Sequence, residues 1–308
     1  AAYGQALHYN RALFTQAGLD PDKAPTSWDE VRADATRIAE TTGKAGYATM
    51  KQGNTGGWIL TSLAYAFGGR AQTVTGDKAT ATVNTPAFVK ALTLMQQMRW
   101  QDNSMGANFL YDWNGINQAF ASGQIGMYVS GGGNYSSLVS QNAINPKDYG
   151  ETVLPLEGAN AGALGGGTLA VVSAKAADDV QDASVKWIDF YYMSKLFDKD
   201  SAVRDAKTQS DSQQPVGAPQ VPVFDKATYQ QTVEWTKSYI NVPVAQMAPY
   251  TTKEFDQQIL PEPAKDTQAL YGDLDPVVQA VLTDKNADVN KLLGDANNTI
   301  QSLLDSGK

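Results

Sequence analysis

The sequence predicts an α/β protein, and three observations support this fold class. Short apolar runs of strand-like composition alternate along the first half of the chain with longer segments of helical apolar spacing. Glycine and proline separate most of these segments. The 308 residues are enough for one large domain or two ordinary ones with a substantial core. Strands that alternate with helices also favour a mostly parallel sheet.

The strongest local signal is a helix between Ser27 and Gly43. Ser27 and Glu30 have the spacing of a capping box, in which each side chain pairs with a backbone N–H of the first turn. Trp28 then takes the first helical position, and the helix is expected to run to about Thr42. Gly43 suits the left-handed conformation that commonly ends a helix.

The other elements are predicted from apolar periodicity and from glycine or proline boundaries. Strands are expected at Ala6–Tyr9, Gly46–Met50, Ala79–Val83 and Ile125–Val129, and a further strand is expected to end at Pro155. The pattern at Thr168–Val172 indicates a buried strand. Helices are expected at Ala12–Ala17, Trp58–Phe67, from Pro86 onward, and at Asp112–Ser122, Val180–Met193, Tyr229–Tyr239, Thr251–Leu260, Ala264–Leu282 and Val289–Leu304.

The composition excludes several classes of function. The net charge is -8 and no basic cluster occurs, which argues against nucleic-acid binding because phosphate contacts need clustered Lys and Arg. The chain has no cysteine and one histidine, so thiolate nucleophiles, iron–sulfur clusters and the usual Cys/His zinc sites are excluded. Neither a metal nor a cofactor is expected. No apolar run approaches the roughly 20 residues that cross a bilayer.

An enzyme is a weaker alternative. The chain contains neither a G-x-S-x-G elbow nor a P-loop, and its three consecutive glycines precede an expected strand rather than a dinucleotide-binding helix. A glycoside hydrolase would need two carboxylates that face each other across a cleft. The 32 acidic residues include no pair that a motif singles out, so no catalytic residue is predicted.

Several segments together resemble a known family. In chain order they read HYNRALFTQAGLDPDKAPTSWDEV (8–31), AYAFGG (64–69), AFASGQIGMYVSG (119–131), YGETVLPLEG (149–158), GGGTLAVVSAKA (165–176), NVPVAQMAPY (241–250) and VNKLLGDANNTIQSLL (289–304). This order resembles the extracellular solute-binding proteins of ABC sugar importers, the class typified by maltose-binding protein. Gly126 is a departure, since the family usually has alanine at that position.

The resemblance implies a periplasmic-binding-protein-like fold of two lobes joined by a hinge. The C-terminal lobe corresponds to residues 1–164 and 226–308, and residues 226–308 are its returning helices. The N-terminal lobe corresponds in part to residues 165–225. Family members normally carry a long further segment before the first motif. The C-terminal lobe is therefore expected to be nearly complete here and the N-terminal lobe partial, with exposed apolar surface.

The resemblance also implies a function, the substrate-binding subunit of an ABC transporter. Such a protein captures a sugar or oligosaccharide between its lobes and delivers it to a membrane permease. The implied partners are a carbohydrate ligand and ABC permease subunits, without nucleic acid, and a monomer is expected. The implied location is the periplasm, or the extracellular face of the membrane through a lipid anchor. The open alternatives are a non-sugar solute, a carboxylate-dependent glycoside hydrolase and a fragment that only interacts with other proteins.

Sugar sites combine flat aromatic faces with directed polar groups, which guides the choice of candidate ligand-binding residues. Trp58 and Trp113 each stand at the start of an expected helix, where the resemblance implies an aromatic residue in the cleft. Tyr250 is a further candidate on the returning segment. Packing inside the lobe is the alternative for Trp58 and Trp113.

Polar and glycine residues complete the candidate set. Asn134 and Tyr135 follow a glycine-rich run, where the resemblance implies a stacking aromatic. Gly165, Gly166 and Gly167 permit a close backbone approach or unusual dihedral angles, either to hold a ligand or only to shape the hinge. The residues expected to pack instead of binding are Trp28, Trp100, Trp187, Trp235 and His8.

Overall fold

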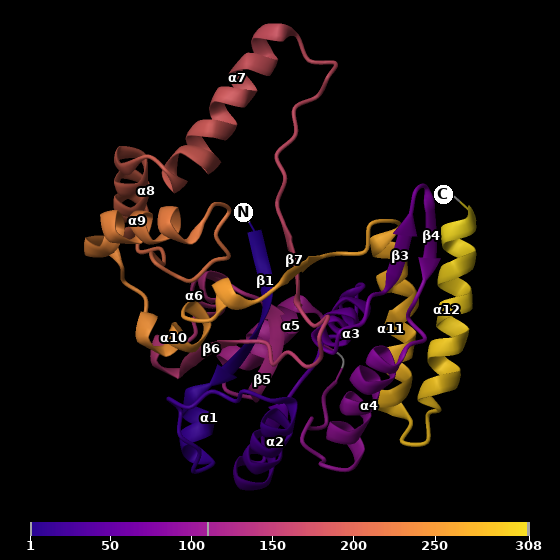
Figure 1. Cartoon of the computed structure of the whole chain (residues 1–308). Coiled ribbons are helices and arrows are strands. Elements are labelled where there is room, and N and C mark those ends of the chain that lie inside the picture. Colours follow the sequence, from indigo (N-terminus) through magenta and orange to yellow (C-terminus); the bar gives the residue numbers. More distant parts are fainter. Residues whose placement is uncertain (1, 110, 307–308) are drawn as a thin grey trace.

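A mixed β-sheet forms the centre of the structure, a computed structural model that describes residues 2–109 and 111–306 (Figure 1). Within these residues the sheet has the strand order β2-β5-β1-β7-β8, with β6 also paired to β1. Its strands are β1 (Ala2–Asn10), β2 (Ala45–Tyr47), β5 (Ile125–Gly131), β6 (Tyr149–Val153), β7 (Ala163–Gly167) and β8 (Ile259–Pro261). A separate hairpin is made of β3 (Gln72–Thr75) and β4 (Lys78–Ala81).

The long strand β1 determines this arrangement. One edge of β1 pairs antiparallel with β5. Its other edge pairs antiparallel with β7 at residues 2–4 and with β6 at residues 6–10. Among the described residues, only β2–β5 and β7–β8 are parallel pairs. The prediction of a mostly parallel sheet is therefore wrong, because the alternation of strands and helices along the chain does not decide which strands become neighbours.

Helices pack against this sheet and against one another. They are α1 (Arg11–Gln16), α2 (Trp28–Thr42), α3 (Thr55–Ala66), α4 (Pro86–Trp100), α5 (Trp113–Ala121), α6 (Tyr135–Asn142), α7 (Asp178–Ile188), α8 (Lys199–Asp211), α9 (Lys226–Thr236), α10 (Ala248–Thr251), α11 (Thr267–Thr283) and α12 (Val289–Ser306). The predicted α/β class is confirmed.

The ends of α2 follow the sequence signals. The Ser27 hydroxyl accepts a hydrogen bond from the Glu30 N–H (3.1 Å), and Gly43 has the left-handed φ of 69°. The Glu30 carboxylate accepts from the N–H of Thr26, one residue earlier than a standard capping box requires. Trp28 is buried as predicted, and its indole N–H donates to the Pro155 carbonyl (3.0 Å).

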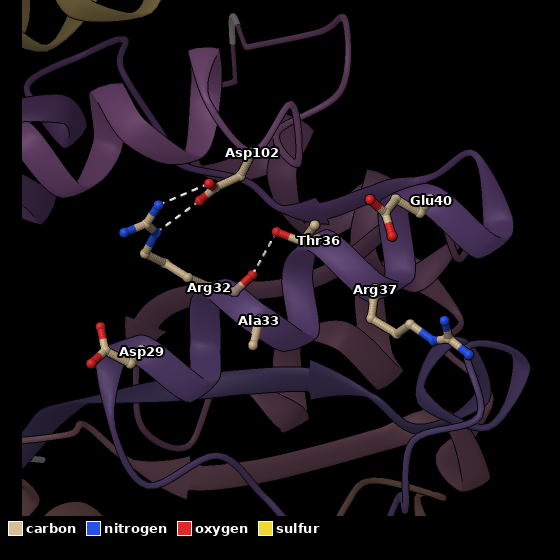
Figure 2. A pocket seen from close by; sticks show the side chains of 7 residues that line it. All are labelled: Asp29, Arg32, Ala33, Thr36, Arg37, Glu40 and Asp102. Carbon is tan, nitrogen blue, oxygen red and sulfur yellow. Dashed lines mark hydrogen bonds and ion pairs between the residues drawn. The ribbon is translucent and has the colours of Figure 1, made fainter.

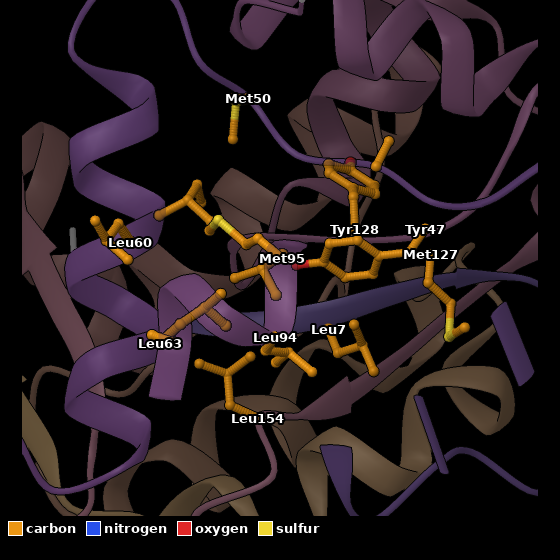
Figure 3. Packing of buried hydrophobic residues seen from close by; sticks show 14 of the residues in the cluster. Leu7, Tyr47, Met50, Leu60, Leu63, Leu94, Met95, Met127, Tyr128 and Leu154 are labelled. Atoms are coloured by element: carbon orange, nitrogen blue, oxygen red, sulfur yellow. The ribbon is translucent and has the colours of Figure 1, made fainter. Parts of the chain in front are cut away.

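A large apolar cluster joins the sheet to helices α3 and α4 (Figure 3). Leu7 and Met127 come from the sheet, Leu60 and Leu63 from α3, and Met95 from α4, and none is more than 1% exposed. Burial of each such side chain contributes roughly 2 kcal/mol to stability.

Helices α7, α8 and α9 lie together and apart from the sheet, and an extended segment leads to α7 from β7 (Figure 1). The strand expected at Thr168–Val172 falls in this segment and does not form, so that prediction is wrong. Leu169 and Val171 are 88% and 87% exposed, because no described strand pairs with them or covers them.

Three tryptophans predicted to be core are less covered than expected. Trp187, on α7, is 56% exposed, and Trp100, at the end of α4, is 37% exposed. Trp235 is partly exposed on α9. For Trp187 the prediction is wrong, because the apolar face of α7 has no described layer packed over it.

The helix predicted at Thr251–Leu260 is also wrong. Helix α10 ends at Thr251, and the chain then forms a 3-10 turn at Glu254–Asp256 followed by β8. Strand β8 runs parallel to β7, with Leu164 opposite Leu260. This long-range pairing overrides the local preference of the segment.

Candidate functional site

Two tyrosines bond to one carboxylate where the start of β1 meets the ends of β7 and β8, and a tryptophan lies against one of them. The Tyr3 hydroxyl donates a hydrogen bond to Oε1 of Glu262 (3.3 Å), and the Tyr271 hydroxyl, from α11, donates to the same oxygen (3.4 Å). The ring of Trp58, on α3, lies edge-on to the Tyr3 ring with the centroids 6.1 Å apart. Tyr3, Trp58, Glu262 and Tyr271 are called the aromatic–carboxylate cluster below.

The sheet register brings Tyr3 and Glu262 together across Gly166. Tyr3 is opposite Gly166 in the β1–β7 pair, and Pro261 is opposite Gly165 in the β7–β8 pair, so Glu262 follows at the level of Gly166. The Tyr3 ring passes so close that a Cβ atom on Gly166 would lie 2.8 Å from the Tyr3 hydroxyl oxygen. Neither glycine has a positive φ, so a close approach and not an unusual dihedral angle requires glycine here.

Helix α3 holds Trp58 through contacts with α11. The two carboxylate oxygens of Asp275 accept hydrogen bonds from the N–H groups of Asn54 (2.8 Å) and Gly57 (2.9 Å). They satisfy donors of the first turn of α3, to which the Asn54 side chain gives no capping bond. A Cβ atom on Gly57 would lie 2.2 Å from the Tyr271 carbonyl oxygen, so glycine lets the two helices approach closely.

The tyrosines of the cluster act as hydrogen-bond donors. Burial, and then the charge of Glu262, raises the pKa of Tyr3 to about 12. The same two causes raise the pKa of Tyr271 above its usual range. Both hydroxyls therefore keep their protons at physiological pH. The second carboxylate oxygen of Glu262, Oε2, accepts no hydrogen bond from residues 2–109 or 111–306.

Two side chains, Gln5 and Trp58 of the cluster itself, have buried hydrogen-bonding groups without a partner among the described residues. Gln5 lies on the same face of β1 as Tyr3, is fully buried, and bonds to no described residue through its amide oxygen or nitrogen. The Trp58 indole N–H is buried and has no well-aligned acceptor in the described chain. It nevertheless lies close enough to the Tyr3 hydroxyl to act against the rise in the pKa of Tyr3. A buried polar group without a hydrogen bond lowers the stability of the folded state, so its presence calls for an explanation. A ligand that supplies the missing hydrogen bond is one such explanation.

The predicted site residues Trp113 and Gly167 lie outside the aromatic–carboxylate cluster, whereas Gly165 lies against the Tyr3 backbone, where a Cβ atom would be 2.6 Å from the Tyr3 carbonyl oxygen. Trp113 begins α5, where Asp112 caps the first turn, and its side chain packs partly buried against the core. Gly165 is buried, and a Cβ atom there would lie 2.4 Å from the Ile259 side chain. Gly167 is exposed at the end of β7.

Asn134 and Tyr135 point into the protein. The Asn134 amide nitrogen donates to Asn117 Oδ1 and to the Tyr128 hydroxyl oxygen, both at 2.8 Å. Tyr135 is 2% exposed, and its ring lies 5.0 Å from the ring of Tyr149, centroid to centroid. Protein contacts occupy both side chains in this conformation.

A second group of titratable side chains is buried near the turn after β5. It comprises His8, Tyr149, Glu151, Tyr250 and Glu254 and is called the buried carboxylate cluster. The N–H of Gly133 donates to Glu151 Oε1 (3.3 Å), and His8 Nδ1 lies 2.8 Å from the Tyr149 hydroxyl oxygen. His8 is fully buried, as predicted.

Burial controls the ionisation of this second cluster. It raises the pKa of Glu151 to about 8 and that of Glu254 to about 7, and it lowers the pKa of His8 to about 4. Burial, and then the two nearby carboxylates, also raises the pKa of Tyr250. Tyr250, a predicted site residue, is 2% exposed and lies directly under Gly132, where a Cβ atom would be 2.5 Å from its hydroxyl oxygen.

A surface hollow of about 420 Å³ lies along α2 (Figure 2). Its charged groups are largely engaged with the protein: the Arg32 guanidinium makes two 2.8 Å bonds to the Asp102 carboxylate, and Arg37 Nε donates to the Ala17 carbonyl (3.0 Å). The hollow contains no aromatic side chain. The aromatic–carboxylate cluster therefore offers the more suitable chemistry for a solute.

Across residues 2–109 and 111–306, no group of three or more His, Asp or Glu side chains is placed to hold a metal ion. No helix among those residues is both long and apolar enough to span a bilayer.

Comparison with known proteins identifies the family. Residues 1–195 match the model of the bacterial extracellular solute-binding proteins, which is more than half of the chain. The chain belongs to this family.

Solved structures of solute-binding proteins share the fold. The cyclic alpha-maltosyl-1,6-maltose binding protein from Arthrobacter globiformis aligns with a TM-score of 0.69 at 22% identity, over 99% of this chain and 71% of that chain. UgpB from Mycobacterium tuberculosis, solved with glycerophosphocholine, aligns with a TM-score of 0.70 at 18% identity, over 100% of this chain and 70% of that chain. The predicted periplasmic-binding-protein-like fold is thereby confirmed.

Curated solute-binding proteins match over shorter stretches. The sn-glycerol-3-phosphate-binding periplasmic protein UgpB of Yersinia pestis is 33% identical over 97 residues, which are 30% of this chain and 21% of that protein. The same-named protein of Salmonella typhimurium is 25% identical over 194 residues, 60% of this chain and 42% of that protein. The matched part thus spans less than half the length of either relative.

Sequence reasoning found part of the aromatic–carboxylate cluster and missed the rest. Of the predicted site residues, Trp58 is a member of the cluster and Gly166 lies against its Tyr3 ring, whereas Tyr3, Glu262 and Tyr271 were not predicted. The signal for Glu262 in the sequence is its place as a single carboxylate between Pro261 and Pro263, just before the helix predicted from Ala264. Tyr3 and Tyr271 lie in ordinary strand and helix patterns, which carry no such signal.

Proposed function

We propose that the chain is the substrate-binding subunit of an ABC transporter, which captures a sugar or oligosaccharide and delivers it to membrane permease subunits. The observation that carries this proposal is that Tyr3 lies against the ring of Trp58 and donates a hydrogen bond to the partly exposed carboxylate of Glu262. Aromatic rings suit the apolar CH faces of a sugar, and a carboxylate oxygen accepts bonds from its hydroxyls.

The proposed mechanism is capture by closure of two lobes. In the division predicted from the sequence, residues 1–164 and 226–308 form one lobe and residues 165–225 form part of the other, with the hinge after β7. The contacts of α9 with α8 favour a second unit that extends past residue 225. Closure follows ligand binding because the closed form makes more contacts with the solute. In this proposal the chain catalyses no reaction and needs no cofactor.

The proposed location is the periplasm, or the extracellular face of the membrane through a lipid anchor. The description of the family as extracellular and the periplasmic relatives support it. The chain is proposed to act as a monomer without nucleic acid, in line with its net charge of -8.

Substitution of Trp58 tests this proposal. Thermal unfolding with a panel of mono- and oligosaccharides is expected to show stabilisation by at least one sugar, about 2.7 kcal/mol at a hundredfold excess over the dissociation constant. Trp58→Ala is expected to weaken calorimetric binding of that sugar about tenfold or more, because it removes a ring face from the site. Trp187→Ala, an exposed tryptophan outside the cluster, is the matched control and should leave affinity unchanged. If no sugar in the panel stabilises the chain, the proposal is refuted.

A further inference from the structure

The charge at the aromatic–carboxylate cluster is negative and lacks a basic partner. Within the described residues, no lysine or arginine forms an ion pair with Glu262. Lys265 is close in sequence, but its ammonium group donates to the Asp77 carbonyl at 2.5 Å. Among residues 2–109 and 111–306, the Tyr3 and Tyr271 hydroxyls are the groups that bond to the carboxylate, and both bond to Oε1.

The unused groups of the site match a solute that supplies hydrogen-bond donors. Glu262 Oε2 can only accept a hydrogen bond, and the amide of Gln5, which can both donate and accept, is fully buried on the same face of β1 as Tyr3. A neutral polyhydroxylated molecule provides both types of group. A phosphate monoester provides acceptors that carry negative charge, which Glu262 repels and no described cation at the cluster neutralises.

We propose that Glu262 determines specificity at this site, so that the chain takes a neutral, hydroxyl-rich solute and rejects anionic solutes such as a phosphate monoester. This inference rests on the proposed function. It separates the chain from the curated relatives that are named for binding sn-glycerol 3-phosphate. The rings of Trp58 and Tyr3 suit any solute with an apolar face, and the charge of the carboxylate distinguishes among such solutes.

Calorimetric titration of the whole chain with neutral sugars, glycerol 3-phosphate and choline tests this inference. The wild-type chain is expected to bind a neutral sugar on the order of 100-fold more tightly than glycerol 3-phosphate, because juxtaposed like charges strongly disfavour association. Glu262→Gln keeps the shape of the side chain and removes its charge. It is expected to weaken sugar binding about tenfold, because a charged acceptor becomes a neutral one, and to strengthen binding of glycerol 3-phosphate.

Glu40→Gln is the control for the change in net charge, since Glu40 is exposed on α2. It should leave the ratio of the two affinities unchanged, while circular dichroism verifies that each variant is folded. A wild-type preference for glycerol 3-phosphate overturns the inference, as does a ratio that Glu262→Gln does not alter. Tighter binding of choline than of any sugar overturns the assignment to a neutral solute. If the folded wild-type chain binds none of the solutes, the proposed function itself fails. If the chain binds a sugar but shows no dependence on Glu262, only the inference about specificity fails.

Discussion

Glu151 is a fully buried carboxylate whose environment makes stability depend on pH. Its pKa is about 8 in the folded chain against an ordinary value of 4.5, so the folded state holds the proton more tightly. The stability from this group is fully present below pH 4.5 and is lost as the pH rises to about 8. Glu254, with a pKa of about 7, acts in the same direction. His8 acts in the opposite direction, but only between its folded pKa of about 4 and its ordinary value of 6.5.

We therefore predict that the free energy of unfolding falls between pH 6.5 and 8, where the carboxylates alone contribute. The slope for one proton is at most about 1.4 kcal/mol per pH unit. Urea denaturation at several pH values in this window measures it. Glu151→Gln should flatten the slope, and the exposed Glu40→Gln should not. An unchanged slope in Glu151→Gln would mean that the carboxylate ionises normally.

Individual site residues were predictable only where the chain signals them locally. Trp58 follows two glycines at the start of a helix, and Gly166 lies in a glycine run, so both could be selected. The hydrogen bond from Tyr3 to Glu262 joins residues 259 positions apart. Sequence patterns report periodicity and turns, and they contain no information about which distant strands become neighbours.

At the scale of elements, helix α3 depends on α11 for its N-terminal cap. Asp275→Ala removes the acceptors for the Asn54 and Gly57 N–H groups. We predict a loss of about 1–2 kcal/mol in the free energy of unfolding, the usual cost of a lost cap. Solute affinity should fall as well, because Trp58 lies in the first turn of α3. Chemical denaturation and calorimetry measure the two effects.

Asp273→Ala is the matched control for this change. Asp273 lies on the same helix and makes no hydrogen bond to α3 within the described residues, so its removal should cost much less. Equal destabilisation by both substitutions would show that α11 charge, and not the cap, supports α3.

Elements with local stop signals were predicted well, and elements that depend on pairing were not. Ser27 and Gly43 fix the ends of α2 through bonds within a few residues. In contrast, β8 exists because Leu260 pairs with β7, and the 168–172 segment stays unpaired because no described strand lies beside it. Whether a segment forms a strand depends on which distant segments lie beside it, and the local sequence does not predict this.

At the scale of the whole molecule, the apolar surface around α7 is the most unusual feature. Val171, Val180 and Trp187 line a mainly apolar hollow of about 630 Å³ between α7 and the extended segment. Trp187 also stacks on Tyr191 with the ring centroids 5.2 Å apart. Exposed patches of this kind usually mark surfaces that another part of a protein covers.

We predict that the chain, as given, binds the hydrophobic dye ANS in its folded state at this hollow. Trp187→Glu should reduce the fluorescence of bound dye several-fold, since it places a charge among the apolar side chains. Val74→Glu, at an exposed apolar residue on the β3–β4 hairpin, is the control and should leave it unchanged. Equal dye binding by wild type and Trp187→Glu would place the apolar surface elsewhere.

The close passage of the Tyr3 ring over Gly166 has a consequence for how these two positions can vary. Alanine at 166 needs space that the tyrosine ring fills, since its Cβ would lie 2.8 Å from the hydroxyl oxygen and 2.9 Å from Cε1. With a smaller residue at position 3 the same alanine would be accommodated. Residues in contact commonly couple by 0.5–3 kcal/mol, so the effects of the two substitutions are expected not to add. Homologous chains should accordingly show covariation between the two sites, with larger residues at 166 only where position 3 is small.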